Sequence, residues 1–288
     1  MRLDDTETER GLQIHPTDHI SPERSTTQDL ILSLFGLFAL DREVNAAFEM
    51  ALIVRLLEQL SISEGAVRVT LHRMVKRGVL DRRRQGRSSA FFLTEDGVAL
   101  LARGRKRVFS SDPFVQQGAG WTLLTTMPPS ASDRARYHFQ TRLQWAGFGA
   151  VDTRVWLAPG RVDVAELMKD VLPQDELQEM CVLHGEIVAP SQLERLIARA
   201  WNTADIQAAH LRFLAEWEER PVSSPALPDL LLLVQQWTGL VLDDPGLPGS
   251  VLDPQWPAPR STATFYRLFP LLREKADDEF ARRLTEAV

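Results

Sequence analysis

The chain has 288 residues, of which 44% are hydrophobic and 25% charged, an ordinary composition for a soluble globular protein. No apolar run approaches the roughly 18 residues of a membrane-spanning helix, and the N-terminus lacks the basic start and apolar stretch of a secretory signal. The single cysteine, Cys181, excludes an internal disulfide framework and fits a reducing cytoplasm. We therefore expect a cytoplasmic protein of two or three domains.

The first third of the chain has the pattern of a DNA-binding domain. Residues 1–24 are polar and acidic without apolar periodicity, which predicts a mobile tail. Residues 25–110 show three amphipathic helices, two extended runs joined by a turn at Gly86, and a further helix. The third helix begins at a capping Ser63 and is ended by Gly78. Three helices and a hairpin in this order predict a winged helix.

The remaining chain completes an α+β multidomain fold. Residues 118–190 follow the order strand, helix, strand, strand, helix, strand, which predicts a ferredoxin-like domain with a structural or dimerisation role. Residues 191–288 are mostly helical and predict a C-terminal domain for an effector or a partner. The expected strands are 121–127, 149–152, 154–157 and 181–184, and the expected helices are 133–145, 164–171, 193–201, 205–219, 226–241 and 262–285.

The distribution of charge favours nucleic-acid binding more than the net charge of -6 does. Residues 63–109 hold twelve Lys and Arg against four Asp and Glu, whereas the segments on both sides are acidic. A phosphate backbone responds to the electrostatic field within about 10 Å. The local excess of positive charge therefore decides whether this segment attracts DNA, and the net charge of the chain does not.

The third helix separates an apolar face from a basic one. Val67, Leu71 and Met74, with Val75 at the margin, fall on one side of a helical wheel. The opposite side is suited to base edges and phosphates in a major groove about 12 Å wide. Arg68 and Arg73 would contact guanine, and Lys76 would contact a phosphate. The N-terminal end of this helix has small side chains, so its backbone amides would also face a phosphate. The DNA-contact residues predicted on this helix are Ser63, Gly65, Arg68, Val69, His72, Arg73 and Lys76.

The hairpin that follows concentrates arginine. Arg82, Arg83 and Arg84 precede the turn and Arg87 follows it. A solvated surface hairpin would also tolerate arginines, but four of them directly after a basic helix favour contacts with phosphates or a narrow minor groove. The hairpin is therefore expected to act as the wing on double-stranded operator DNA.

Four separated blocks resemble one family. "SEGAVRVTLHRMVKRGVLDRRRQGRSSAFFLTEDG" is similar to the winged-helix segment of the PaaX family of regulators of phenylacetic acid catabolism. "WTLLTTMPPSASDRARYHFQTRLQWAGFGAVDTRVWLAP" resembles that family's central domain, and "LIARAWNTADIQAAHLRFLAEWE" and "LVLDDPGLPGSVLDPQWP" resemble its C-terminal part. Residues 40–50 depart from the family by lacking a basic stretch with Pro and Gly.

The resemblance implies a homodimeric repressor released from its operator by an aryl-acetyl coenzyme A thioester, phenylacetyl-CoA in the type case. No motif in the sequence specifies coenzyme A. Regulators of one family can keep their fold while they change ligands, so the fold alone does not identify the effector. Candidate effector contacts are aromatic or cationic side chains in the second and third domains, although ordinary core packing is the favoured interpretation of each tryptophan. These candidates are Trp145, Arg154, Trp156 and Trp201.

Enzymatic alternatives find little support. The six histidines are scattered and Cys181 has no partner cysteine, so we expect no metal site, and Walker and nucleophile-elbow motifs are absent from the sequence. The central domain resembles a small CRISPR-associated nuclease fold that binds metal at the end of its first strand. Here that strand end, from Thr125 to Pro129, has no carboxylate before Asp133, so we expect no nuclease activity, catalytic residue or cofactor.

A third hypothesis is a regulator that acts through a protein partner or through a different small-molecule effector. The apolar stripe at residues 230–234 would serve as the partner surface if it were exposed, or would face the core. We favour the second alternative, in which this stripe packs into the core.

Overall fold

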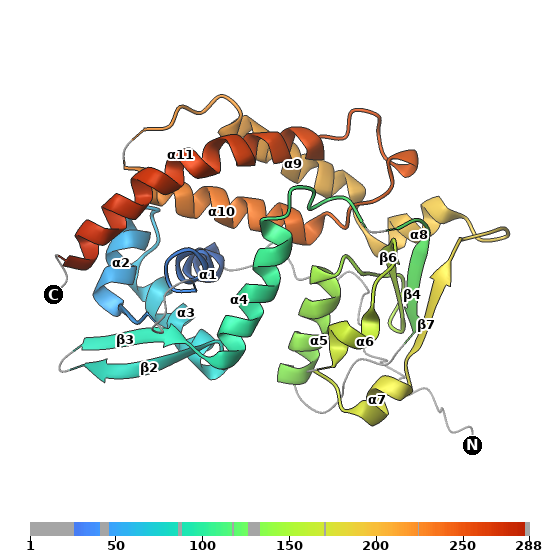
Figure 1. Cartoon of the computed structure of the whole chain (residues 1–288), viewed down its shortest axis with the longest axis horizontal. Helices are drawn as coiled ribbons and strands as arrows, with labels where there is room; N and C mark the ends of the chain where they lie inside the picture. Colours follow the sequence, from blue (N-terminus) through green and yellow to red (C-terminus); the bar gives the residue numbers. More distant parts are fainter. Residues whose placement is uncertain are drawn as a thin grey trace, which may run out of the picture.

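A computed structural model describes residues 26–40, 46–85, 88–116, 118–125, 133–169, 171–223 and 225–285. Within these ranges the chain is a mixed α+β protein with eleven α-helices and two small antiparallel sheets (Figure 1). The tail predicted at residues 1–24 lies outside the described residues, so this prediction stays open. None of the helices within the described ranges is long and apolar enough to cross a membrane.

The N-terminal unit has the element order that the sequence predicts. Three helices precede an antiparallel hairpin whose strands pair from Leu80 with Leu93 to Gln85 with Ser88. A short strand before the second helix, which no periodic pattern predicts, joins the same sheet through Phe48 and Phe91. The elements are α1 (Thr26–Phe38), β1 (Phe48–Glu49), α2 (Met50–Glu58), α3 (Glu64–Lys76), β2 (Leu80–Gln85), β3 (Ser88–Leu93) and α4 (Glu95–Val108).

The central unit is a four-stranded sheet with the strand order β5-β6-β4-β7. Leu124 and Trp156 pack with α5 and α6 on one face of the sheet, and Leu157 packs with Trp201 and the C-terminal chain on the other. The expected strand at 149–152 is shorter than predicted, and α7 was not predicted. The elements are β4 (Trp121–Thr125), α5 (Asp133–Trp145), β5 (Gly149–Ala150), β6 (Val155–Pro159), α6 (Val164–Met168), α7 (Gln174–Gln178) and β7 (Cys181–Gly185).

The C-terminal unit is helical, as predicted. Its last helix begins four residues earlier than expected, at Ala258, because Pro259 is compatible with the first turn of a helix, where no backbone N–H is needed. The elements are α8 (Leu193–Ala200), α9 (Thr203–Trp217), α10 (Ala226–Asp243), the short 3-10 helix η1 (Gly249–Val251) and α11 (Ala258–Thr285).

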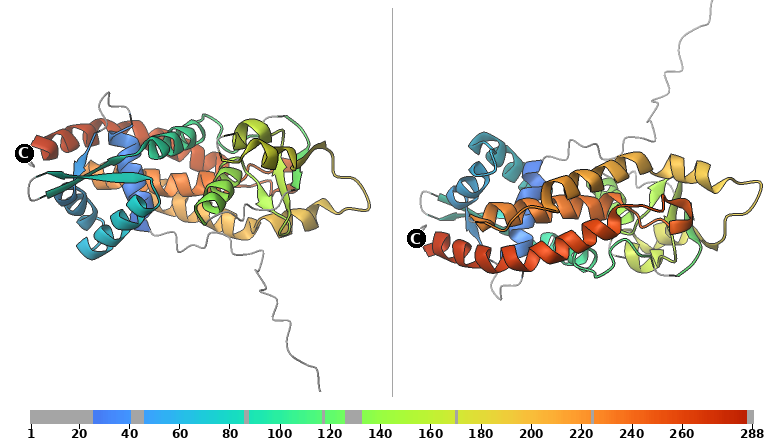
Figure 2. Two further views of the ribbon diagram at one scale, coloured as in Figure 1. Left: turned by 90° about the horizontal axis from the view of Figure 1, so that it is seen from below. Right: turned by 90° about the horizontal axis from the view of Figure 1, so that it is seen from above.

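One apolar core joins the first and last parts of the chain. Figures 1 and 2 show α10 and α11 side by side, and α1 packs against α10. The rings of Phe38 in α1 and Phe280 in α11 stack with centroids 4.1 Å apart. In the stripe at residues 230–234, four side chains are buried in this core and Leu232 is partly buried, so the core interpretation is confirmed and the stripe offers no partner surface. Although they are far apart in sequence, the N-terminal and C-terminal units share one interior.

A partly buried arginine links all three units. The guanidinium of Arg107, on α4, donates to the carbonyl oxygens of Gln144 (3.2 Å), Trp145 (2.6 Å) and Asp244 (2.9 Å). Burial lowers the pKa of Arg107 to about 10, and the neighbouring Asp244 partly offsets this shift. The group therefore stays charged at neutral pH, and it satisfies carbonyls at the C-terminal ends of α5 and α10.

Asp244 is itself held by its neighbours. Its side chain accepts hydrogen bonds from the indole N–H of Trp256 and the backbone N–H of Gly246, and His210 Nε2 lies 3.1 Å from Oδ2. His210 Nδ1 is 3.0 Å from the hydroxyl of Ser261. The fixed Asp244 thus presents its carbonyl to Arg107 in a defined position.

We predict that Arg107→Leu destabilises the whole chain. The substitution leaves three carbonyls without their donor and removes the cation beside Asp244, and breaking such a buried polar network costs about 3–5 kcal/mol. Urea unfolding followed by circular dichroism measures the change. Arg103→Leu, at an exposed position of the same helix, is the matched control and should change stability by less than about 0.5 kcal/mol. Equal losses for the two variants would contradict the structural role of Arg107.

Candidate nucleic-acid interface

Helix α3 is defined at both ends by local hydrogen bonds. The hydroxyl of Ser63 accepts a hydrogen bond from the backbone N–H of Ala66 at 3.3 Å and caps the N-terminus. At the other end Gly78 adopts a left-handed φ of 72°, and its N–H donates to the carbonyl of Val75. Ser63 and Gly78 therefore have the capping roles that the sequence predicts, and they fix the length of the helix.

The helix has a buried inner face and a polar outer face. Val67, Leu71 and Met74 are buried, and Thr70 is buried beside them at 6% exposure. Val69 is 51% exposed, so its methyl groups are accessible on the outer face of the helix. The predicted contact residues that the structure places on exposed positions are Ser63, Gly65, Arg68, Val69, His72, Arg73 and Lys76.

The cations of this face differ in their surroundings. The Nε of Arg68 donates to the carboxylate of Glu64 at 2.7 Å, so a phosphate or base must compete with an internal ion pair. Arg77 donates to the side chain of Gln28 on α1 at 2.9 Å. No described residue forms an ion pair or side-chain hydrogen bond with Arg73. Among these three arginines, Arg73 is the one best placed to bind a new anion or base.

The hairpin divides its arginines between two faces. Alternation along β2 places Arg82 and Arg84 on one side and Arg83 on the other. Arg83 lies over the ring of Phe92, with the guanidinium carbon 5.3 Å from the ring centroid. All three side chains are exposed, and Arg87 lies outside the described residues. The three arginines of β2 therefore do not form one continuous face, although a count of charges treats them alike.

The basic block also includes a residue with a different role. Arg107 contributes to the positive charge of residues 63–109, but its guanidinium points into the junction of the three units. Arg103, Arg105 and Lys106 of the same helix are exposed. A count of charges alone does not distinguish Arg107, which holds the three units together, from the exposed cations of the same helix.

The four candidate effector residues occupy separate places. Trp145, at the end of α5, lines a cavity against α4. Arg154 is exposed in the turn before β6, Trp156 is buried between the sheet and α5, and Trp201 is buried next to Trp121. The structure therefore does not assemble them into one site.

The described residues contain no cluster of three or more His, Cys, Asp or Glu side chains suited to a metal ion. They do contain a serine, a histidine and an aspartate in hydrogen-bond contact, Ser261, His210 and Asp244, which sequence reasoning missed because the three lie far apart in the chain. All three are 0–1% exposed, so a substrate has no access to the serine hydroxyl. This cluster supports the fold, as described above, and offers no exposed nucleophile.

Comparison with known proteins identifies the family. Three family models match in order: a PaaX-like protein over residues 26–97, the PaaX protein central Cas2-like domain over 116–197, and the PaaX-like protein C-terminal domain over 201–282. The chain belongs to the PaaX family.

Individual relatives were also found. The transcriptional repressor PaaX of Escherichia coli (strain K12) is 28% identical over 221 residues, which cover 71% of this chain and 67% of that protein. Among solved structures, an uncharacterized protein from Mycobacterium tuberculosis matches with a TM-score of 0.48 and 21% identity, covering 88% of this chain and 97% of that one.

In this PaaX family member, the position of the hairpin depends on a glycine at the start of α4. The hydroxyl of Thr94 accepts from the N–H of Gly97 at 3.0 Å and donates to the carbonyl of Gly78 at 2.6 Å. A Cβ on residue 97 would collide with the carbonyl oxygen of Val79, where the chain enters the hairpin. The helix start, the end of α3 and the hairpin are thus packed backbone to backbone.

We predict that Gly97→Ala lowers the free energy of unfolding by about 1–3 kcal/mol, because the added methyl group overpacks this contact. Gly65→Ala is the matched control, since a Cβ there meets nothing within 4 Å, and it should raise stability by up to about 1 kcal/mol through helix propensity. Thermal and urea unfolding of both variants measure the difference. A Gly97→Ala protein as stable as the Gly65→Ala protein would refute the close packing.

Proposed function

We propose that the chain is a DNA-binding transcriptional repressor in which α1 to α4 and the hairpin act as a winged helix. The observation that carries the proposal is α3, whose inner face is buried and whose outer face exposes Arg68, His72, Arg73 and Lys76. An exposed basic helix followed at once by an arginine-bearing hairpin is the arrangement that reads a major groove and anchors the flanking backbone. The E. coli relative, which is called a transcriptional repressor, supports the same function.

The roles of individual cations follow from their surroundings. Arg73 has no internal partner among the described residues and is proposed to make a bidentate contact to guanine. Arg68 would exchange its bond with Glu64 for one to a phosphate or base. Arg82 and Arg84 share a face of the hairpin and are proposed to contact phosphates, whereas Arg83 is engaged with Phe92 on the other face.

The central unit is proposed to be a ferredoxin-like domain that mediates dimerisation. Its element order and its strand order β5-β6-β4-β7 support the fold assignment. Strand β7 lies at the edge of the sheet, and every residue of it is exposed, with Leu183 at 60%. An edge strand with exposed apolar side chains is suited to pairing with a second copy, and a symmetric dimer would present two α3 helices to two half-sites.

The small-molecule response is proposed by analogy to the family. An aryl-acetyl-CoA, of which phenylacetyl-CoA is the type case, would bind the dimer and favour an arrangement of the two α3 helices that does not fit the operator of an aromatic catabolic operon. The chain is proposed to carry out no chemical reaction on this ligand.

The experiment compares Arg73→Ala with Arg84→Ala on the DNA upstream of the protein's own gene and on random DNA, using fluorescence anisotropy at fixed salt. Arg73→Ala should cost about 1–3 kcal/mol on the upstream DNA and much less on random DNA, because a base contact is lost. Arg84→Ala should weaken binding to both DNAs equally, because a phosphate contact is lost.

Arg199→Ala, at an exposed position of α8 remote from the hairpin, is the control and should bind as the unmodified protein does. Equal losses on both DNAs for Arg73→Ala would contradict base reading by α3. No binding of the unmodified chain to either DNA would contradict the proposed function itself.

A further inference from the structure

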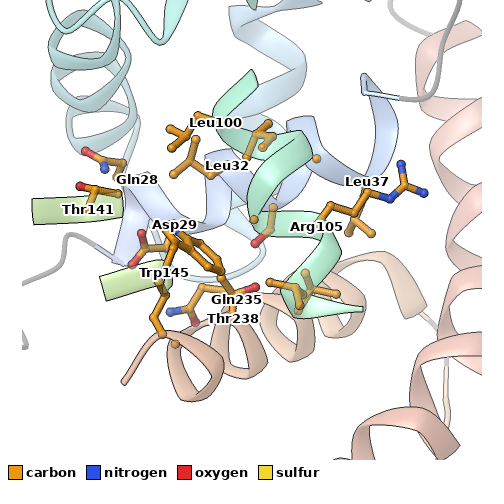
Figure 3. Close-up of a pocket in the computed structure, with 18 of the residues that line it drawn as sticks. Gln28, Asp29, Leu32, Leu37, Leu100, Arg105, Thr141, Trp145, Gln235 and Thr238 are labelled. Carbon is orange, nitrogen blue, oxygen red and sulfur yellow. The ribbon is translucent and has the colours of Figure 1, made fainter. Parts of the chain in front are cut away.

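A cavity of about 530 Å³ lies where the three units meet. It is bounded by α1, α3, α4, α5 and α10 (Figure 3). Its volume falls within the range of about 300–1,000 Å³ that small-molecule sites occupy. The cavity is therefore large enough for an aromatic ring with a short substituent, and it touches the helix proposed to read DNA.

The interior of the cavity is mainly apolar and is kept open by glycines. Leu32 on α1 and Leu100 on α4 point into it (Figure 3). Gly36 on α1 and Gly239 on α10 also line the cavity, and a Cβ on either would meet nothing within 4 Å. Glycine in a helix interior costs about 1 kcal/mol relative to alanine, so two such residues facing the same open space favour a function for that space.

The wall formed by α5 presents an aromatic ring to the cavity (Figure 3). The indole of Trp145 lies against Gly104 of α4, where a Cβ would come within 3.2 Å of the ring. Thr141, one turn earlier on α5, has a buried hydroxyl for which no described residue supplies a hydrogen-bond partner. Neighbouring atoms cover this hydroxyl, so the indole is the group that this wall presents to the cavity.

The rim of the cavity carries an excess of positive charge. Arg73 and Arg77 from α3 and Arg105 from α4 line it, against one carboxylate, Asp29 of α1. Asp29, Arg77 and Arg105 have interaction partners within the protein. The guanidinium of Arg73 has none among the described residues, so it is the cation best placed to bind an anionic group of a ligand.

We propose that this cavity is the effector site and that it takes a ring-sized apolar group with a negative charge beyond it, which Arg73 binds. The inference rests on the proposed function, because it gives Arg73 two competing partners. The same guanidinium lies on the outer face of α3 and at the rim of the cavity. A ligand that engages Arg73 from the cavity withdraws it from DNA, and this lowers operator affinity without any unfolding of the winged helix.

Two sources would supply this ligand chemistry. A free aryl carboxylate would place its carboxylate at Arg73. An aryl-acyl thioester would place its ring in the cavity and its phosphates outside. Phenylacetate and phenylacetyl-CoA represent the two sources, coenzyme A alone lacks the ring, and phenylacetamide keeps the ring without the charge.

Isothermal titration calorimetry of the full chain in the absence of DNA tests the site with these four probes. The unmodified protein should bind phenylacetate or phenylacetyl-CoA, and it should bind coenzyme A and phenylacetamide at least about tenfold more weakly. Gly239→Leu fills the cavity and should weaken binding of the favoured probe by at least about tenfold. Gly249→Leu, at an exposed glycine whose Cβ also meets nothing within 4 Å, is the matched control and should leave affinity unchanged.

Gly36→Leu fills the opposite wall and replaces Gly239→Leu if that variant fails to show native circular dichroism. Arg73→Ala should also weaken binding of the favoured probe by about tenfold in the same assay. Unchanged affinity in the cavity-filling variants, no binding of either charged aryl probe, or equal binding of phenylacetamide would each overturn the proposal. Because the titration contains no DNA, it tests the ligand site even if the chain does not bind an operator.

Discussion

The hydrogen bonds of Arg107 are the constraint on which the arrangement of the three units depends. Its guanidinium joins α4 to the carbonyl ends of α5 and α10, and Asp244 is held in place by His210, Trp256 and Gly246. The end of α4 is tied further, because the carbonyl of Val108 accepts a hydrogen bond from the indole N–H of Trp237. With its C-terminal end tied by these long-range partners, α4 has little freedom to shift relative to the C-terminal helices.

This constraint would connect the proposed ligand site physically to the proposed DNA-binding surface. Helix α3 packs on α1, and α1 packs on α10, so the helix proposed to read DNA is part of the shared core and is not a domain on a flexible linker. The cavity lies at that junction and is lined by residues from all three units. A ligand there changes the surroundings of Arg73 directly, and coupling requires only a difference in ligand affinity between the DNA-bound and free arrangements.

The sequence predicted the elements whose signals are local, and it missed those that depend on distant partners. The two faces of α3 follow from helical period, and Ser63 and Gly78 are recognisable caps, so the outer face was identified residue by residue. The alternation that separates Arg83 from Arg82 and Arg84 also lies in the sequence, but counting charge concealed it. Arg107 could not be distinguished from its basic neighbours, because its partner Asp244 is 137 positions away. The cavity could not be predicted for the same reason, because its walls come from distant parts of the chain. Of the four candidate effector residues, Trp145 alone lines it.

A footprint of the full chain on DNA upstream of its own gene shows whether α3 occupies an operator and whether a ligand releases it. We expect protection of two half-sites about one helical turn, 34–36 Å, or a multiple of it apart, and loss of that protection when the aryl-acyl ligand is added. Protection that persists unchanged at saturating ligand would contradict the coupling between the cavity and α3. The absence of any protected region would contradict the assignment of α3 as the reading helix.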